Sequence, residues 1–236
     1  MGDIKRSNSF RSVTDELNFD KIAEVSLDGR ARFYHGSTAL FKGVDLDFCN
    51  GDNKDFGKGF YLSATEEFSQ WYFDKGAKSA NSGVDIDVDK YYLYQCLVDT
   101  AVEKLPNYLN LTNNLKALAK VCYIGRFHCT DKKDLLKDYD AILGWMVDDL
   151  NFDSIRNRLV TLGLLTRKPH NKKWIYEGKD ANELLDSELD SLLEIMFMND
   201  KDGAYQLAIK NKLIAENTRY VNLQEPNVVP IGGINV

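Results

Sequence analysis

Short stretches in which apolar and polar residues alternate recur along the chain, and a period of two residues predicts β-strands. The predicted strands cover residues 31–35, 60–63, 90–98, 139–143, 205–209 and 219–223. The first strand ends at Gly36 and Ser37, and a turn-rich loop at residues 50–57 precedes the second. Strands of this length need partners from elsewhere in the chain to form a stable sheet.

Other segments repeat their apolar residues every three or four positions, which predicts helices. The predicted helices cover residues 64–76, 109–127, 152–164 and 182–198, and Thr65 is a suitable N-cap for the first of them. Strands and helices do not follow one another in a regular βαβ order. The fold class predicted from this pattern is therefore α+β, not a doubly wound sheet.

Composition places the chain among ordinary globular proteins: 44% of its 236 residues are hydrophobic and 28% are charged. Residues 1–25 are polar and weakly periodic, so we expect a loosely ordered N-terminal arm followed by a single domain at 26–236. No apolar run resembles a signal peptide or a membrane span, which favours a cytoplasmic protein without a membrane partner. The four cysteines form no CxxC pair, which argues against a zinc site and indicates reduced structural thiols.

Three short motifs carry candidate chemistry. Tyr34-His35-Gly36-Ser37 lies at a predicted strand end, residues 55–63 read DFGKGFYLS, and Gln206 lies in a late strand. None of them is a P-loop or a Rossmann fingerprint. Taken singly, each has an ordinary structural explanation, such as a tight turn at the glycines or an aromatic core position.

Taken together and in this order, the motifs resemble the ADP-ribosyltransferase superfamily, in its branch with histidine, tyrosine and a variable third residue. In the poly(ADP-ribose) polymerases of that superfamily, a strand tyrosine and a helix tyrosine sandwich nicotinamide, with a serine just before the second. Tyr61, Ser69 and Tyr72 have the same spacing. With the segment ILGWMVDD, the motifs resemble most closely an uncharacterised bacterial family of this superfamily, over residues 31–225. The fold implied is a split β-sheet core with flanking helices and a helical insertion.

The resemblance also implies that NAD is the substrate and that no metal takes part. His35 would hydrogen-bond the adenosine-side ribose, the backbone of Gly36 would hold the nicotinamide carboxamide, and Ser37 would contact a ribose hydroxyl. Tyr61 and Tyr72 would stack on the two faces of the pyridinium. Ser69 would bond the carboxamide. The implied NAD-binding residues are His35, Gly36, Ser37, Phe60, Tyr61, Ser69 and Tyr72.

The third catalytic position departs from the best-known pattern, which has a glutamate on a late strand. Its best counterpart is Gln206, with Glu216 and Glu225 as alternatives. An amide can bond ribose hydroxyls but cannot act as a general base. Asp148 and Asp149 either form a turn and helix cap or supply the missing carboxylate to the NAD site.

A basic run follows the third predicted helix and comprises Arg167, Lys168, His170, Lys172 and Lys173. A solvated loop around Pro169 is the simpler interpretation, and a contact with a phosphate-rich acceptor is the alternative. The formal charge of −6 removes the easiest argument for a nucleic-acid partner, although a local basic patch can coexist with an acidic surface.

The function implied is mono-ADP-ribosylation: cleavage of NAD at the nicotinamide–ribose bond and transfer of ADP-ribose to a macromolecular acceptor, protein or nucleic acid. NAD hydrolysis with water as acceptor and a catalytically inactive NAD-binding module are the alternatives. The resemblance is also compatible with a toxin or phage-defence role, about which the residues themselves say nothing.

Overall fold

The computed structural model describes residues 16–37, 40, 42–49, 54–70, 92–129, 133–147, 152–170, 173–196 and 204–223. The strands are β1 (Arg30–Ser37), β2 (Phe60–Ser63), β3 (Tyr92–Asp99), β4 (Tyr108–Asn110), β5 (Ala141–Trp145), β6 (Leu165–His170), β7 (Lys173–Gly178), β8 (Tyr205–Ile209) and β9 (Arg219–Asn222). The α-helices are α1 (Phe19–Ile22), α3 (Leu115–Phe127), α4 (Phe152–Thr161), α5 (Asp186–Met196) and α6 (Lys212–Asn217). Short 3-10 helices cover Leu46–Phe48, Thr100–Lys104 and Ala181–Glu183.

Seven of the described strands form one mixed sheet in the order β4-β5-β8-β2-β1-β3-β9. The β4–β5 pair is parallel and the remaining neighbours are antiparallel. β1 pairs with β3 along its whole length, from Arg30↔Asp99 to Ser37↔Tyr92, whereas β1 meets β2 at the single pair Tyr34↔Ser63. The sheet therefore consists of two parts, β4-β5-β8-β2 and β1-β3-β9, joined at one residue pair. The predicted α+β class is confirmed.

The central strands bury both of their faces. In β5 the side chains of Ala141 and Leu143 belong to one hydrophobic cluster and Ile142 to the other, and Leu207 and Ala208 divide in the same way in β8. All five of these side chains are fully buried. A strand that packs against apolar layers on both sides needs a continuous apolar sequence, as these two have.

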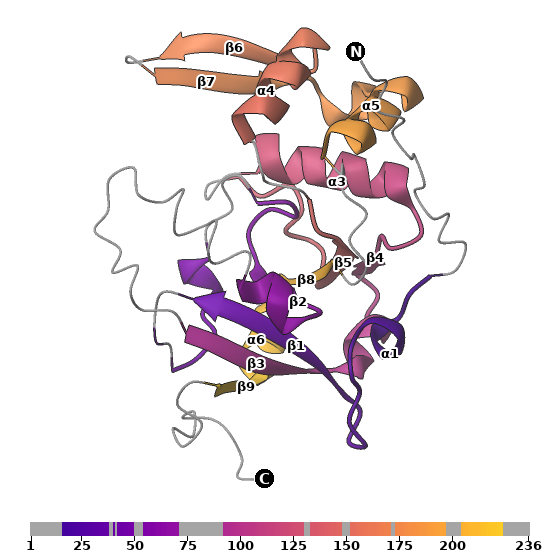
Figure 1. Cartoon of the computed structure of the whole chain (residues 1–236), viewed down its shortest axis with the longest axis vertical. Coiled ribbons are helices and arrows are strands. Elements are labelled where there is room, and N and C mark those ends of the chain that lie inside the picture. The colour runs from indigo at the N-terminus through magenta and orange to yellow at the C-terminus, as the bar shows by residue number, and fades with distance from the viewer. Residues whose placement is uncertain are drawn as a thin grey trace, which may run out of the picture.

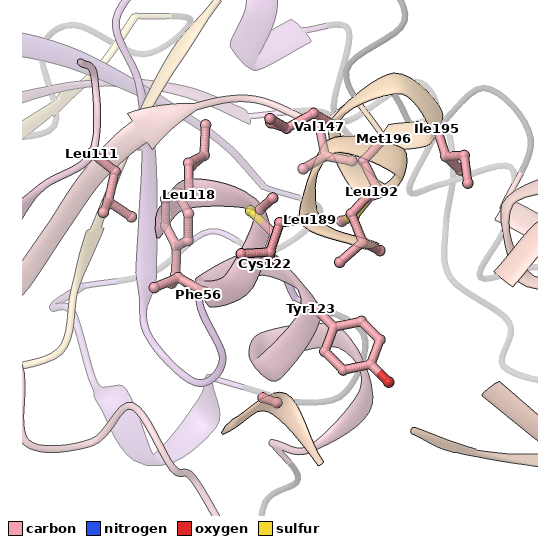
Figure 2. Close-up of a cluster of buried hydrophobic side chains, with 14 of the residues drawn as sticks. Phe56, Leu111, Leu118, Cys122, Tyr123, Val147, Leu189, Leu192, Ile195 and Met196 are labelled. Atoms are coloured by element: carbon pink, nitrogen blue, oxygen red, sulfur yellow. The ribbon is translucent and has the colours of Figure 1, made fainter. Parts of the chain in front are cut away.

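The first cluster lies between the sheet and helices α3, α4 and α5 (Figure 1). Helix α3 begins at the cap of Asn114, whose side chain accepts from the backbone N–H of Ala117 at 3.0 Å. Leu118 and Cys122 follow at helical spacing and point toward the sheet and α5 (Figure 2). The helix is shorter than predicted from residues 109–127, because residues 108–110 form β4 and lie beside β5.

The second cluster covers the opposite face and includes Phe19 of α1. The Phe19 ring packs edge-on against Phe33 at 5.2 Å and against Tyr108 at 6.0 Å, and the backbone N–H of Phe19 donates to Glu103 at 2.8 Å. Within the predicted N-terminal arm at 1–25, the described residues 16–25 are thus packed on the domain, because Phe19 is fully buried.

The basic run after α4 is an antiparallel hairpin of β6 and β7, not the solvated loop predicted for it. Pro169 is accommodated because the two strands form a sheet of their own, in which its position pairs with Trp174 at the exposed far end. The hairpin projects beyond α4, at the end of the molecule farthest from β9 (Figure 1). Within the described ranges, the structure contains no helix of the length and apolarity required to cross a membrane.

Candidate functional site

The two parts of the sheet separate beside the first two motifs. β1 and β2 run antiparallel, so a continued ladder beyond Tyr34↔Ser63 would set Gly36 opposite Tyr61. The ladder stops at Tyr34↔Ser63 instead, and the His35 imidazole spans the separation. Its Nδ1 lies 2.7 Å from the backbone oxygen of Tyr61. Two motifs that are 26 residues apart in the chain thus meet at one place.

The His35 imidazole is neutral at ordinary pH. Its removal from water lowers the pKa of His35 from 6.5 to about 4, and the positive charge of Lys54 acts in the same direction. A carbonyl oxygen can only accept, so Nδ1 carries the proton and Nε2 is the acceptor nitrogen. The ring also contacts Phe60, with the ring centres 4.7 Å apart. The contacts with Tyr61 and Phe60 therefore fix both the tautomer and the orientation of the His35 ring.

Strand register determines which face each candidate occupies. Ser63 pairs with Gln206 and Tyr61 with Ala208, so Tyr61 and Gln206 lie on the same face of the sheet. The pair Tyr34↔Ser63 puts the next residue, His35, on the face of Phe60, which agrees with their ring contact. A ligand that touches both His35 and Tyr61 would therefore lie across the separation of β1 and β2.

Tyr61 is held by the loop that precedes it. Its hydroxyl donates to the backbone oxygen of Gly57 and accepts from the backbone N–H of Phe56, both at 2.8 Å. Gly57 has φ of 71°, a left-handed conformation that a side chain would strain. Burial raises the pKa of the Tyr61 phenol well above its ordinary value, so the hydroxyl stays protonated. The phenol ring has a fixed position before any ligand binds.

A buried polar cluster lies behind Tyr61 and contains Asp55, Arg126 and Gln206. Arg126 Nε donates to Asp55 Oδ1 at 2.7 Å, and Gln206 Nε2 donates to Asp55 Oδ2 at 2.6 Å. Gln206 Nε2 also donates to the backbone oxygen of Trp145 at 3.3 Å. All three side chains are at most 4% exposed. The predicted third catalytic residue is thus tied to the DFGKGFYLS motif through its first residue.

Asp55, Arg126 and Lys210 are site residues that the sequence analysis did not single out. Lys210 Nζ donates to the backbone oxygen of Phe56 at 2.9 Å, to that of Lys58, and to Asp134 Oδ2 at 3.0 Å. Burial lowers the pKa of Lys210, and the nearby Asp134 carboxylate opposes that shift. Asp55 is the first residue of the DFGKGFYLS motif, and its place in that motif was the signal that could have identified it as a site residue. Arg126 and Lys210 lie 71 and 155 residues away from Asp55 in the chain and carried no local signal.

Ser69 has an unusual environment for a hydroxyl. It lies in the helical stretch at 66–70, is 2% exposed, and its Oγ has no hydrogen-bond partner within the described structure. A buried polar atom without a hydrogen-bond partner lowers the stability of the folded chain, unless a further group supplies the missing hydrogen bond. Gly36 and Ser37 lie at the end of β1, paired with Leu93 and Tyr92 of β3.

The remaining predicted positions do not join this group. Tyr72, Asp148, Asp149 and Glu225 lie outside the described residues. Glu216 is in α6 and half exposed, with its Oε1 3.8 Å from Lys212 Nζ. Among the residues that the structure describes, no cluster of three His, Cys, Asp or Glu side chains has the arrangement of a metal site.

A separate surface hollow of about 390 Å³ lies beside the joining pair. Its lining includes Lys21 of α1, Glu24 just after that helix, Arg32 and Tyr34 of β1, and Glu66. Arg32 is ion-paired to Glu24 at 2.6 Å, so the basic and acidic side chains around the hollow balance. Its lining shows no preference for a charged ligand.

Comparison with known proteins gives a family but no activity. No curated protein and no solved structure matches this chain. A family model described as "Protein of unknown function (DUF3990)" matches residues 31–173, which include all of β1 but its first residue, the loop around Asp55 and helix α3. The chain belongs to the DUF3990 family, whose function is unknown.

Proposed function

We propose that this chain has an ADP-ribosyltransferase-like fold and binds NAD where β1 and β2 separate. The observation that carries the proposal is the single joining pair Tyr34↔Ser63, with the His35 imidazole bonded to Tyr61 across the separation beside it. A split in a sheet leaves backbone groups on both rims, and these can bond a flat polar ligand.

The residues at this separation suit the nicotinamide half of NAD. The Gly36 backbone would approach the carboxamide without a side chain in the way. The rigidly held Tyr61 ring would offer an electron-rich face to the cationic pyridinium. The unsatisfied hydroxyl of Ser69 would gain a partner in the carboxamide.

The proposed reaction breaks the bond between nicotinamide nitrogen and ribose C1′. Nicotinamide leaves with the electron pair of that bond, and positive charge develops on the ribose. A nucleophilic atom of a macromolecular acceptor then bonds to C1′ and loses its proton. His35 Nε2, an acceptor in the neutral ring, would bond the adenosine-side ribose and hold the dinucleotide in place.

Gln206 argues for transfer of a single ADP-ribose rather than chain elongation. Its amide nitrogen is bound by Asp55 and the backbone of Trp145, which fixes the orientation of the whole amide group. An amide so held can accept a hydrogen bond from a ribose hydroxyl through Oε1. It is too weak a base to take up a proton at useful pH, so it cannot act as a general base.

The first test measures nicotinamide release from NAD by the purified chain. We expect His35→Ala and Tyr61→Ala to reduce release by about a hundredfold or more, the size typical of losing one stabilising group at a reaction centre. His170→Ala and Tyr176→Ala, in the distant hairpin, are the matched controls and should retain it. Equal release by all four variants, each shown to be folded by circular dichroism, would refute the proposal.

The second test identifies the acceptor. Cell lysate is incubated with the chain and NAD labelled in its adenylate, and is then digested with protease or nuclease. Loss of macromolecular label after one digestion assigns the acceptor to protein or to nucleic acid. Label found only as free ADP-ribose would mean that water is the acceptor and the chain is an NAD glycohydrolase.

A binding module without turnover is the second candidate, and the polar cluster favours it. The only carboxylate bonded to Gln206 among the described contacts is Asp55, and Arg126 already neutralises it. Calorimetry that shows saturable NAD binding by a chain releasing no nicotinamide would establish this alternative.

A further inference from the structure

Positive charge is concentrated in one segment of an acidic chain. Residues 154–179 contain seven Lys or Arg and a single acidic residue, Glu177, whereas the whole chain has 30 basic and 36 acidic residues. This segment comprises most of α4 and the whole β6–β7 hairpin. The molecule therefore carries a local cationic surface on an overall anionic body, which would attract a polyanion locally.

Aromatic rings lie between the cationic groups on one face of the hairpin. Arg167 pairs with Tyr176, and Pro169 with Trp174, so all four side chains are on the same face. The guanidinium carbon of Arg167 lies 3.8 Å from the centre of the Trp174 ring, and that of Arg156, from α4, lies 5.1 Å from the Tyr176 ring. Two stacked cation–aromatic pairs thus run side by side from α4 onto the hairpin.

Packing accounts for Tyr176, which lies against the first cluster, but not for the exposed end of the hairpin. Trp174 is 53% exposed and Ile175 is 39% exposed, and every β6 residue after Leu165 is exposed. Two-stranded hairpins are marginally stable by themselves, and large exposed aromatic side chains are unfavourable in water. The opposite face adds Lys168, which is ion-paired to Glu177. An exposed indole on a cationic hairpin is explained more simply by a ligand than by packing.

The hairpin is remote from the candidate NAD site. Helix α3 lies between the β1–β2 region and the elements α4, β6 and β7 (Figure 1). Binding on the hairpin would therefore leave the separation of β1 and β2 uncovered, and its test does not depend on the proposed function.

We propose that the β6–β7 hairpin and α4 bind single-stranded nucleic acid. Arg156 and Arg167 would contact backbone phosphates, and Trp174 would stack on an unpaired base. Single-strand binding surfaces combine a cationic track with exposed aromatic rings, because every base offers a flat face irrespective of sequence. An acidic protein would need only the positive charge and would make no use of the Arg167–Trp174 stack. Duplex DNA keeps its bases stacked out of reach of Trp174.

The experiment measures fluorescence anisotropy of a labelled mixed-sequence 20-mer, as DNA and as RNA, with the full chain at 50 and 200 mM salt. We expect binding that weakens at least tenfold between the two salt concentrations, as release of counterions from several phosphates requires. Trp174→Ala should weaken binding to either strand about tenfold at constant salt, with its salt dependence retained. Arg167→Ala should weaken binding and also reduce the salt dependence.

Lys212→Ala is the matched control, because Lys212 is an exposed basic residue on α6 outside the cationic segment. It should bind as the unaltered chain does. Failure of both 20-mers to bind at 50 mM salt, or equal affinity of the Trp174, Arg167 and Lys212 variants, would overturn the proposal. Binding of a labelled polyglutamate peptide with higher affinity than either 20-mer would overturn it too and would assign the surface to an acidic protein. Each variant is checked for unchanged thermal unfolding, which excludes loss of the hairpin as the cause.

Discussion

His35 illustrates how burial fixes the chemical state of one side chain. Its neutral imidazole donates to the Tyr61 carbonyl, and protonation would put a positive charge in a position removed from water. The pKa of His35 is lowered to about 4 in the folded chain, below the ordinary 6.5 that an unfolded chain would have. The unfolded state therefore binds more protons between these two values, and stability must fall as the pH drops through that window.

The change His35→Gln tests this dependence. We expect the unaltered chain to lose up to about 1.4 kcal/mol of unfolding free energy per pH unit from this residue between pH 6.5 and 4, and the variant to lack that contribution. Urea unfolding at pH 7, 5.5 and 4.5 measures the difference between the two chains. His170→Gln, in the exposed hairpin, should keep the slope of the unaltered chain. A parallel loss of stability in the His35→Gln chain would show that the imidazole is not held neutral by the fold.

Helix α3 and the loop before β2 show how closely two elements are packed. A Cβ added at Gly125 would lie 2.3 Å from the backbone oxygen of Asp55 and 2.6 Å from that of Lys54. This close approach lets Arg126, the next residue, reach Asp55 from the same helix. The loop that holds Tyr61 is therefore set by the position of α3.

Gly125→Ala is expected to destabilise the chain by about 1–3 kcal/mol or more, because backbone must move to relieve the contact. Helix propensity alone would predict the opposite, a gain of about 1 kcal/mol from replacing glycine inside a helix. Gly43→Ala is the control, since an added Cβ there meets no atom within 4 Å. Urea denaturation of the unaltered chain and the two variants decides between the steric contact and the gain in helix propensity. An unchanged or raised midpoint for Gly125→Ala would show that the added Cβ meets no steric contact that destabilises the fold.

Elements with a local signal were predictable from sequence, and those determined by distant contacts were not. Strands β2 and β8 begin and end at the predicted residues 60–63 and 205–209, because apolar runs bounded by turn residues mark buried strands. The β6–β7 hairpin was missed because its charged residues resemble a solvated loop. Every β6 residue after Leu165 is exposed, so no apolar residue recurs at a period of two to mark that strand. The motifs at His35 and Tyr61 were recognisable as candidates. The Asp55–Arg126 pair spans 71 residues and depends on how α3 packs, which no local pattern records.

The whole molecule is organised around the junction of its two sheet parts. Tyr61 packs against the cluster that contains α3, and Phe60 belongs to the cluster on the opposite face, so adjacent residues of β2 connect the two cores. One residue pair, Tyr34↔Ser63, joins β1 to β2 in this region. A ligand bound across the junction would add contacts to both parts and stabilise the folded chain as a whole.

Ser69→Ala tests this coupling between the proposed NAD site and global stability. In the free chain we expect the variant to be about 1 kcal/mol more stable, because it removes a buried hydroxyl without a partner among the described residues and favours helix.

NAD at a hundred times its dissociation constant should stabilise the unaltered chain by about 2.7 kcal/mol, or roughly 5–10 °C in Tm for a domain of this size. At that NAD concentration the increase should be smaller in Ser69→Ala, since the carboxamide loses its bond to the hydroxyl. Ser191→Ala, at a half-buried position of α5 whose hydroxyl donates to the backbone oxygen of Ser187 at 2.9 Å, should leave the NAD-induced increase unchanged. Differential scanning calorimetry of the three chains with and without NAD measures both effects. A Ser69→Ala chain that is less stable when free yet gains the full increase from NAD would show that the hydroxyl serves the fold and not the ligand.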